Sequence, residues 1–272
     1  MARLLRIKIM KQLIKYNFVL LIITIFSVSA FGQTPAAMEK EMVGLYEKIN
    51  ANSAYSSNND SELLEKSNED FKRKILQYTK SAPTLKYKFS ELEEDVSIAT
   101  SEDGKFRVYS WDRMDGGTMH FFETVYQFQG ADGNVYSKSN DLEEGDSGSF
   151  VYEIFEVEAK TEKVYLVCST SILSTSDAYQ SVNLFEIENN SLNSNIKLIK
   201  TKTKLNNSLG FEYDFFSVVD RKERPIKLIL FDKKTKTISI PVVIDDTKFQ
   251  YGKVTNKFIS YKFNGTYFVK VN

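Results

Sequence analysis

The sequence predicts an α+β protein in which an N-terminal helical pair is followed by a large antiparallel β meander, either sandwich or propeller-like. Apolar residues recur at helical spacing between residues 36 and 78. From Val96 onward, short apolar and aromatic runs alternate with turn sequences, which is typical of strands. Three segments are expected: a signal peptide over 1–32, a helical segment over 34–82 and an antiparallel β body over 83–272.

Residues 1–32 have the pattern of a secretory signal peptide. Basic residues precede an apolar run over 18–26, and small residues at Ala30 and Gly32 offer cleavage sites. The apolar run is shorter than the roughly 20 residues that a spanning helix needs. We therefore expect export to the periplasm, the outer surface or the medium, with no membrane span after the signal is removed.

Two amphipathic helices are expected next. In the first, over residues 36–50, the apolar face consists of Met38, Met42, Leu45 and Ile49. In the second, over residues 60–78, it consists of Leu64, Phe71, Ile75 and Tyr78. Asn59 with Glu62 predicts a capping-box start for the second helix.

Pro83 is predicted to end the helical part, and alternation of Leu85, Tyr87 and Phe89 predicts a first strand. Asp103-Gly104 and Asn264-Gly265 mark hairpin turns. Strand starts near 98, 150 and 211 suggest a four-strand unit that repeats. The further strands are expected near 96–101, 105–112, 119–129, 133–138, 149–157, 163–170, 181–188, 195–201, 210–219, 225–232, 236–243, 254–263 and 266–271.

The segment over 98–128 contains the only Trp, Trp111, and the only His, His120. Arg107, Tyr109 and Trp111 share one face of a predicted strand, so we expect this strand to be covered on both sides or the Arg107 stem to lie along aromatic rings. Gly116 and Gly117 are expected to let the following strand approach Trp111.

This segment resembles one found in exported bacterial proteins of unknown function. The resemblance implies export and a β-rich body, and it implies no activity. It covers about 30 residues, and the residues that carry it are Ser101, Asp103-Gly104-Lys105-Phe106-Arg107, Tyr109-Ser110-Trp111-Asp112, Gly116-Gly117-Thr118-Met119-His120 and Gln127.

Charge and cysteine content exclude several classes of protein. The whole chain is neutral, but residues 96–190 hold six bases and 17 acids, whereas residues 191–272 hold 16 bases and seven acids. We interpret this asymmetry as solvated faces, although it could orient a partner. The acidic mature chain and the lack of a Gly-rich phosphate loop argue against nucleic acid. Cys168 is the only cysteine, and we expect it to be a buried free thiol.

Candidate chemistry is sparse. Gly145-Asp146-Ser147-Gly148-Ser149 resembles the nucleophile segment of chymotrypsin-like proteases, but the context of His120 does not fit that family, so Ser147 is not expected to be a nucleophile. One His and one Cys cannot form a His-rich metal site, and no cofactor is expected. Acids in the loops over 112–146 could serve hydrolysis or could simply be solvated turn residues.

The leading functional prediction is an exported, non-catalytic binding protein whose partner is an unknown protein or a glycan. The alternative is a periplasmic or extracellular hydrolase of envelope or polymeric substrates that uses loop carboxylates. Candidate ligand-binding residues are Trp111, Asp112, Asp115 and His120, although for Trp111 a buried structural anchor is the preferred interpretation. Lys200, Lys202 and Lys204 could attract an anionic glycan or phospholipid, or could protect an edge strand.

Overall fold

The computed structural model describes residues 33–140, 142–143, 145–159 and 162–271. The predicted signal peptide therefore lies outside the described residues. The chain divides within its first described helix, after residue 38, and residues 39–272 form one unit.

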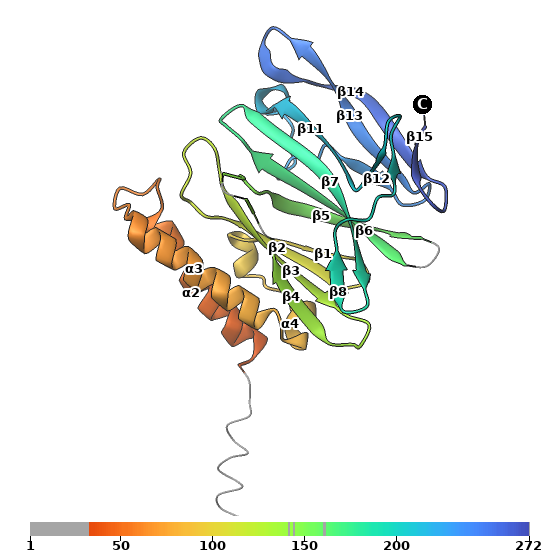
Figure 1. Ribbon diagram of the computed structural model, residues 1–272. Helices are drawn as coiled ribbons and strands as arrows, with labels where there is room; N and C mark the ends of the chain where they lie inside the picture. Colours follow the sequence, from red (N-terminus) through yellow and green to blue (C-terminus); the bar gives the residue numbers. More distant parts are fainter. Residues whose placement is uncertain (1–32, 141, 144, 160–161, 272) are drawn as a thin grey trace, which may run out of the picture. The chain divides into compact units, whose positions relative to one another are not determined.

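Both expected helices are present. They are α2 (Pro35–Asn52) and α3 (Ser61–Tyr78) (Figure 1). The predicted apolar face of α3 is buried, and in α2 Met42 and Ile49 are fully buried. The capping residue differs from the prediction, because Asp60, not Asn59, is the N-cap and accepts hydrogen bonds from the backbone N–H groups of Glu62 and Leu63.

The predicted strand over Leu85–Phe89 is wrong. Residues Ala82–Lys86 form a short helix, α4, with Pro83 in its first turn, and a 3-10 turn, η2 (Leu92–Glu94), follows. Proline fixes a φ angle that suits the first turn of a helix, so Pro83 begins this helix and does not end the helical part. The helical segment thus continues beyond the expected boundary at residue 82.

Three sheets, which we call sheets A, B and C, form the β body. Sheet A has the strand order β1 (Ser97–Thr100), β2 (Phe106–Asp112), β3 (Phe122–Gln129) and β4 (Val135–Ser139). Sheet B has the order β11 (Ser208–Asp214), β7 (Asp177–Glu188), β6 (Lys163–Ile172) and β5 (Phe150–Glu158), with β8 (Ser191–Asn193) beside β7. Sheet C has the order β10 (Leu205–Asn206), β9 (Ile199–Lys200), β15 (Phe268–Val271), β14 (Phe249–Phe263), β13 (Thr237–Asp246) and β12 (Leu230–Asp232).

The expected α+β class with a β-rich antiparallel body is confirmed. Pairing is antiparallel throughout the described strands except between β9 and β15. The strands expected over 195–201 and 225–232 are shorter in the structure, where they are β9 and β12. Within the strand expected over 210–219, residues Phe215–Ser217 form a 3-10 helix, η3. The short strands β8 and β10 are not among the predicted strands. Residues Thr201–Lys204 form a turn at the edge of sheet C, so the three lysines do not share one strand.

Sheet B is the middle layer, because its strands supply residues to two separate cores (Figure 1). Tyr165 and Val167 of β6 pack against Phe106 and Val108 of sheet A. The alternating neighbours in β6, Leu166 and Cys168, pack with apolar residues of sheet C, among them Ile238 and Phe268. Successive side chains of a strand point to opposite faces, and in sheet B both faces are covered. The prediction of a buried Cys168 thiol is confirmed.

Strand β2 joins sheet A to the helices. Six of its residues are buried, so the expectation of a strand covered on both faces is confirmed. Trp111 is 1% exposed, and its ring lies edge-on to Phe71 of α3 at a centroid distance of 4.9 Å. The expected burial of Trp111 is therefore confirmed, and its role as a structural anchor stays a prediction. A Cβ atom on Gly116 would meet the Met119 carbonyl oxygen at 2.0 Å, so this glycine serves the close turn of its own loop.

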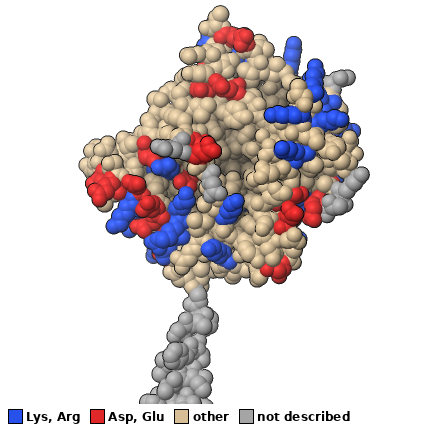
Figure 2. Space-filling view, viewed as in Figure 1, with Lys and Arg blue, Asp and Glu red and all other residues tan. Residues whose placement is uncertain are grey.

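Charge is unevenly spread over the molecule. Figure 2 shows Lys and Arg side chains gathered over the region of sheet C. The exposed residues there include Lys200, Lys202, Lys204 and Lys270. β10 is an edge strand of sheet C, which is the position that the edge-protection interpretation of these lysines requires. That interpretation and attraction of an anionic ligand both stay predictions. Within the described part of the chain, no helix is long and apolar enough to cross a membrane.

Candidate functional site

Two cavities lie on opposite faces of sheet B. Val167, Ser169 and Ser171 of β6 line a polar cavity, whereas Thr170 and Ile172 of the same strand line an apolar one. The alternation of side chains along a β-strand places these two sets on opposite faces. One strand thus contributes to two chemically different cavities.

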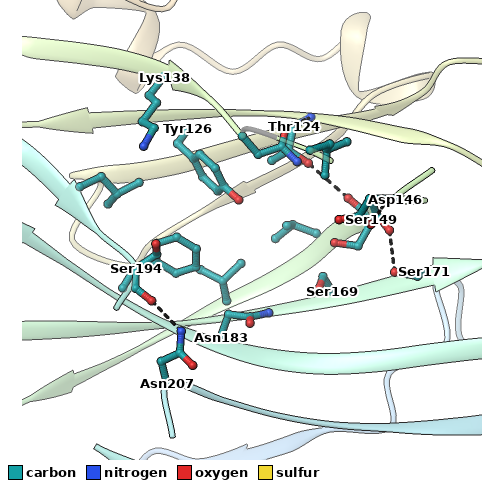
Figure 3. A pocket seen from close by; sticks show the side chains of 17 residues that line it. Thr124, Tyr126, Lys138, Asp146, Ser149, Ser169, Ser171, Asn183, Ser194 and Asn207 are labelled. Atoms are coloured by element: carbon teal, nitrogen blue, oxygen red, sulfur yellow. Dashed lines mark hydrogen bonds between the residues drawn. The ribbon is translucent and has the colours of Figure 1, made fainter. Parts of the chain in front are cut away.

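The polar cavity, of about 460 Å³, lies between sheets A and B. Thr124 and Tyr126 enter from β3, Lys138 from β4, and Asn183 from β7, as Figure 3 shows. Its volume falls in the range of small-molecule sites in proteins. The remaining lining residues are Asn140, Leu142, Asp146, Gly148, Ser149, Val151, Val167, Ser169, Ser171, Phe185, Leu192, Ser194 and Asn207.

Several polar groups that line the polar cavity have no hydrogen-bond partner among the described residues. Tyr126 is held by ring contacts with Phe106 and Phe185, and its hydroxyl forms no hydrogen bond with the described residues. The side-chain N–H groups of Asn183 and Asn207 donate to Ser181 and to the Ser194 carbonyl, which leaves both amide oxygens open. None of these free atoms is buried from solvent. They are therefore available to a molecule in the cavity.

Charge in the polar cavity is low. Lys138 and Asp146 are the charged side chains among the described lining residues, and no ion pair of Lys138 occurs in the described part of the chain. Burial raises the pKa of Tyr126 to about 12, so its hydroxyl stays protonated and can donate as well as accept. The cavity is thus suited to hydrogen bonding rather than to a highly charged ligand.

The segment that resembles a protease nucleophile loop forms one rim of this cavity. Ser147 is 6% exposed, and its hydroxyl donates to the Gly148 carbonyl. Gly148 has a φ of 61°, and a Cβ atom there would meet the Phe122 carbonyl oxygen at 2.1 Å, so only glycine fits against the start of β3. The hydroxyl of Ser147 is therefore not held by His120. The neighbouring Asp146 and Ser149 line the cavity instead.

Of the predicted site residues, the structure brings Asp112 and His120 together. The His120 Nδ1 atom lies 2.5 Å from Asp112 Oδ2, and the imidazole stacks with Tyr55 at a centroid distance of 5.8 Å. Nε2 of His120 has no hydrogen-bond partner among the described residues. His120 lines the apolar cavity, not the polar one.

The other two predicted residues lie elsewhere. Trp111 is in the core beside Phe71, and its indole N–H has no partner among the described residues. Asp115 forms an ion pair with Arg113 at 2.5 Å, and both line a separate hollow beside the start of α3. Burial raises the pKa of the Asp115 carboxyl. The four candidates therefore do not form one site.

The loop over 112–118 is attached to the helical part. The Ala54 N–H donates to the Met114 carbonyl at 2.8 Å, and the Tyr55 hydroxyl donates to the Gly117 carbonyl at 3.1 Å. Asn68 donates from its side chain to the Arg113 carbonyl at 2.8 Å. This loop therefore has a structural role in docking the helices onto sheet A.

Apart from Asp146, Gly148 and Ser149 of the protease-like segment, the residues that line the polar cavity belong to no motif identified in the sequence. The available signal was the alternation Val167, Ser169, Ser171 against Cys168, Thr170, Ile172, which places small hydroxyl side chains on one face of an otherwise apolar strand. Within the described residues, no cluster of three or more His, Cys, Asp or Glu side chains could hold a metal ion. Comparisons with known proteins found no matching family model, curated protein or solved structure.

Proposed function

We propose that this protein is an exported, non-catalytic binding protein whose polar cavity holds a glycan. One observation carries the proposal: Tyr126, Asn183 and Asn207 line the cavity with polar atoms that no described protein group satisfies. Sugar hydroxyls donate and accept hydrogen bonds, as do the hydroxyls and amides of this wall. A glycan would replace the water that otherwise satisfies these atoms.

An exposed aromatic side chain beside the cavity supports the same ligand class. Tyr179 of β7 is 38% exposed and pairs across the strands with Ser171, which lines the cavity. A Cβ atom on Gly210 would lie 2.1 Å from the Tyr179 hydroxyl oxygen, so this glycine leaves room for the ring. A flat ring with a polar end can cover the C–H face of a sugar while its hydroxyl remains in water.

The direct test is a glycan array probed with the labelled protein, followed by calorimetry on the glycan that binds best. Tyr126→Phe removes one hydroxyl that has no protein partner, so the fold keeps its contacts while the ligand loses a hydrogen bond. We expect affinity to fall about tenfold, the equivalent of a hydrogen bond of about 1.4 kcal/mol.

Tyr136→Phe is the matched control. Tyr136 lies on β4 outside the cavity, and its hydroxyl donates to Asp132. Affinity should be unchanged in this variant. The proposal fails if no glycan binds, or if the two variants lose affinity equally.

Export is part of the proposal and rests on the basic and apolar pattern of residues 1–32. Intact-mass measurement of protein from an envelope fraction should give a chain that begins after Ala30 or Gly32. Full-length protein in the cytoplasm would contradict it.

A hydrolase of envelope or polymeric substrates is the second candidate, and the Asp112–His120 pair favours it. A carboxylate that orients a histidine through Nδ1 leaves Nε2 for general-base work. Glycoside hydrolysis usually needs two facing carboxyl groups, whereas Asp146 is the one carboxylate among the described residues that line the polar cavity. Because His120 lies outside the polar cavity, the hydrolase is tested on soluble envelope polymers rather than on the glycan held there. Mass spectrometry after long incubation separates the two candidates: a binding protein returns the polymer intact, and a hydrolase returns fragments that His120→Gln no longer produces.

A further inference from the structure

The apolar cavity on the opposite face of sheet B is a second site. Its volume is about 500 Å³, and its wall includes Phe150, Ile172, Phe215 and Ile226, which come from four different segments of the chain. We infer that this cavity binds a small molecule with an apolar body and one anionic group, such as a carboxylate. This inference is independent of the glycan proposal, because the two cavities have no lining residue in common.

The interior of this cavity offers few hydrogen bonds. The side chain of Gln180 is fully buried, and both its amide N–H and its amide oxygen are bonded to protein groups. It donates to the Ile226 carbonyl and accepts from the Leu228 N–H and the Tyr152 hydroxyl. Thr170 is 6% exposed, and its hydroxyl finds no partner in the described part of the chain. A ligand body that enters here would thus meet mainly apolar surface, with burial as its driving force.

Arg224 places a positive charge in the wall of the cavity, and hydrogen bonds to the backbone hold its guanidinium in position. Arg224 donates to the backbone carbonyls of Val219, Arg221 and Glu223, at 3.0, 2.5 and 2.7 Å. No carboxylate forms an ion pair with Arg224 in the part of the chain that the structure describes. The neighbouring Glu223 is paired with Arg221.

A fixed cation without an acidic partner attracts an anion, and the carbonyl contacts reduce the entropy lost when the anion binds. The same charge would repel a cationic ligand of equal apolar area. Charge complementarity therefore decides which kind of amphiphile this cavity takes.

The test uses 1-anilinonaphthalene-8-sulfonate, an apolar dye with one anionic group, and follows its fluorescence on titration into the purified protein. We expect saturable binding of one dye per chain. Decanoate should displace the dye, and decyltrimethylammonium, which has an equal chain and the opposite charge, should displace it at least tenfold less well. No saturable binding, or equal displacement by the two amphiphiles, would overturn the inference without reference to any variant.

Variants then locate the dye. Arg224→Gln should weaken binding about tenfold, while Lys222→Gln, a neighbouring exposed cation outside the cavity wall, should leave it unchanged. Ala178→Leu adds volume to the wall, keeps the arginine at position 224 and should also weaken binding. Tyr126→Phe in the polar cavity should have no effect on the dye. Parent-like dye affinity in a folded Ala178→Leu protein would show that the dye binds elsewhere and would overturn the assignment.

Discussion

Arg107 is a buried cation that backbone carbonyls and aromatic rings accommodate. Its guanidinium donates to the carbonyls of Thr84 and Tyr87 at 3.0 and 2.7 Å, and it lies about 6 Å from the ring centres of Phe89 and Tyr109. The charge thus fastens the segment after α3 to strand β2. Arg107 belongs to the segment over 98–128, and these contacts give the arginine at this position a structural role.

Gln127, from the same segment, continues this network. Its amide accepts from the Tyr109 hydroxyl and donates to the Thr79 carbonyl and the Thr84 hydroxyl. The side chain of Gln127 is fully buried, so these hydrogen bonds replace the ones that its amide would make with water in the unfolded chain. Arg107 and Gln127 therefore hold the helical part on sheet A, and neither lines the polar cavity.

Trp111→Ala should lower the free energy of unfolding by about 3–5 kcal/mol, because it leaves a large void beside Phe71. Phe258→Ala, at an aromatic residue that is 41% exposed, is the control and should change it much less. Urea unfolding measures both. Emission of the parent protein should be blue-shifted and poorly quenched by iodide; freely quenched, red-shifted emission would contradict the buried position.

Asp103 predicts a specific acid sensitivity. Burial raises the pKa of its carboxyl, but hydrogen bonds from the Lys105 N–H, the Ser101 hydroxyl, Lys163 and Tyr165 together outweigh burial, and the pKa lies below its usual value. A carboxyl whose folded-state pKa is lowered stabilises the protein above its unfolded-state pKa, near 4, and this contribution is lost as the pH falls through the folded-state pKa.

Asp103→Asn should therefore cost on the order of 1.5–3 kcal/mol at neutral pH. Its stability should fall less steeply than that of the parent between about pH 5 and pH 2. Chemical unfolding at a series of pH values measures this. If parent and variant lose stability in parallel in acid, Asp103 does not contribute the expected linkage.

At the scale of elements, the start of α3 gives the clearest test of local structure. Asp60→Ala removes the side chain that accepts from two N–H groups of the first turn, and it should cost about 1 kcal/mol. Asn59→Ala is the matched control, because Asn59 is the residue that the capping-box pattern indicates. Urea midpoints distinguish the two, and a larger loss for Asn59→Ala would contradict the observed cap.

Elements with a strong local pattern could be predicted. The helical face of α3 and the long strands of sheets A and B follow from periodicity, and Gly104, with a φ of 68°, forms the expected turn before β2. The structure of the segment over 82–89 could not be predicted, because alternating apolar residues also occur where a short helix is followed by extended chain. There, Thr84 and Leu85 are buried by tertiary contacts that local spacing does not contain.

The candidate site was less accessible to sequence reasoning than the fold. His120 and Asp112 could be singled out by rarity and charge, and they meet because β2 and β3 pair across a short loop. The described lining residues of the polar cavity come from six strands of two sheets. A serine or asparagine on a strand gives the same sequence pattern whether it faces solvent or a cavity. Only the packing of sheet A on sheet B distinguishes the two.

At the scale of the whole molecule, the organisation depends on sheet B as a wall between two cavities of different chemistry. Its face toward sheet A carries hydroxyls and amides, and its other face carries Phe150 and Ile172. Methyl groups occur on both faces, with Val151 and Val167 in the polar cavity and Ile172 and Ile226 in the apolar one. These methyl groups report separately on the two sites.

The most direct measurement is methyl-resolved NMR of protein labelled at Ile, Leu and Val, titrated with the glycan that the array identifies. The glycan should shift the methyl signals of Val151, Val167 and Leu192 and leave those of Ile172 and Ile226 in place. Shifts confined to Ile172 and Ile226, or no shifts at saturating glycan, would contradict the assignment of the polar cavity as the glycan site.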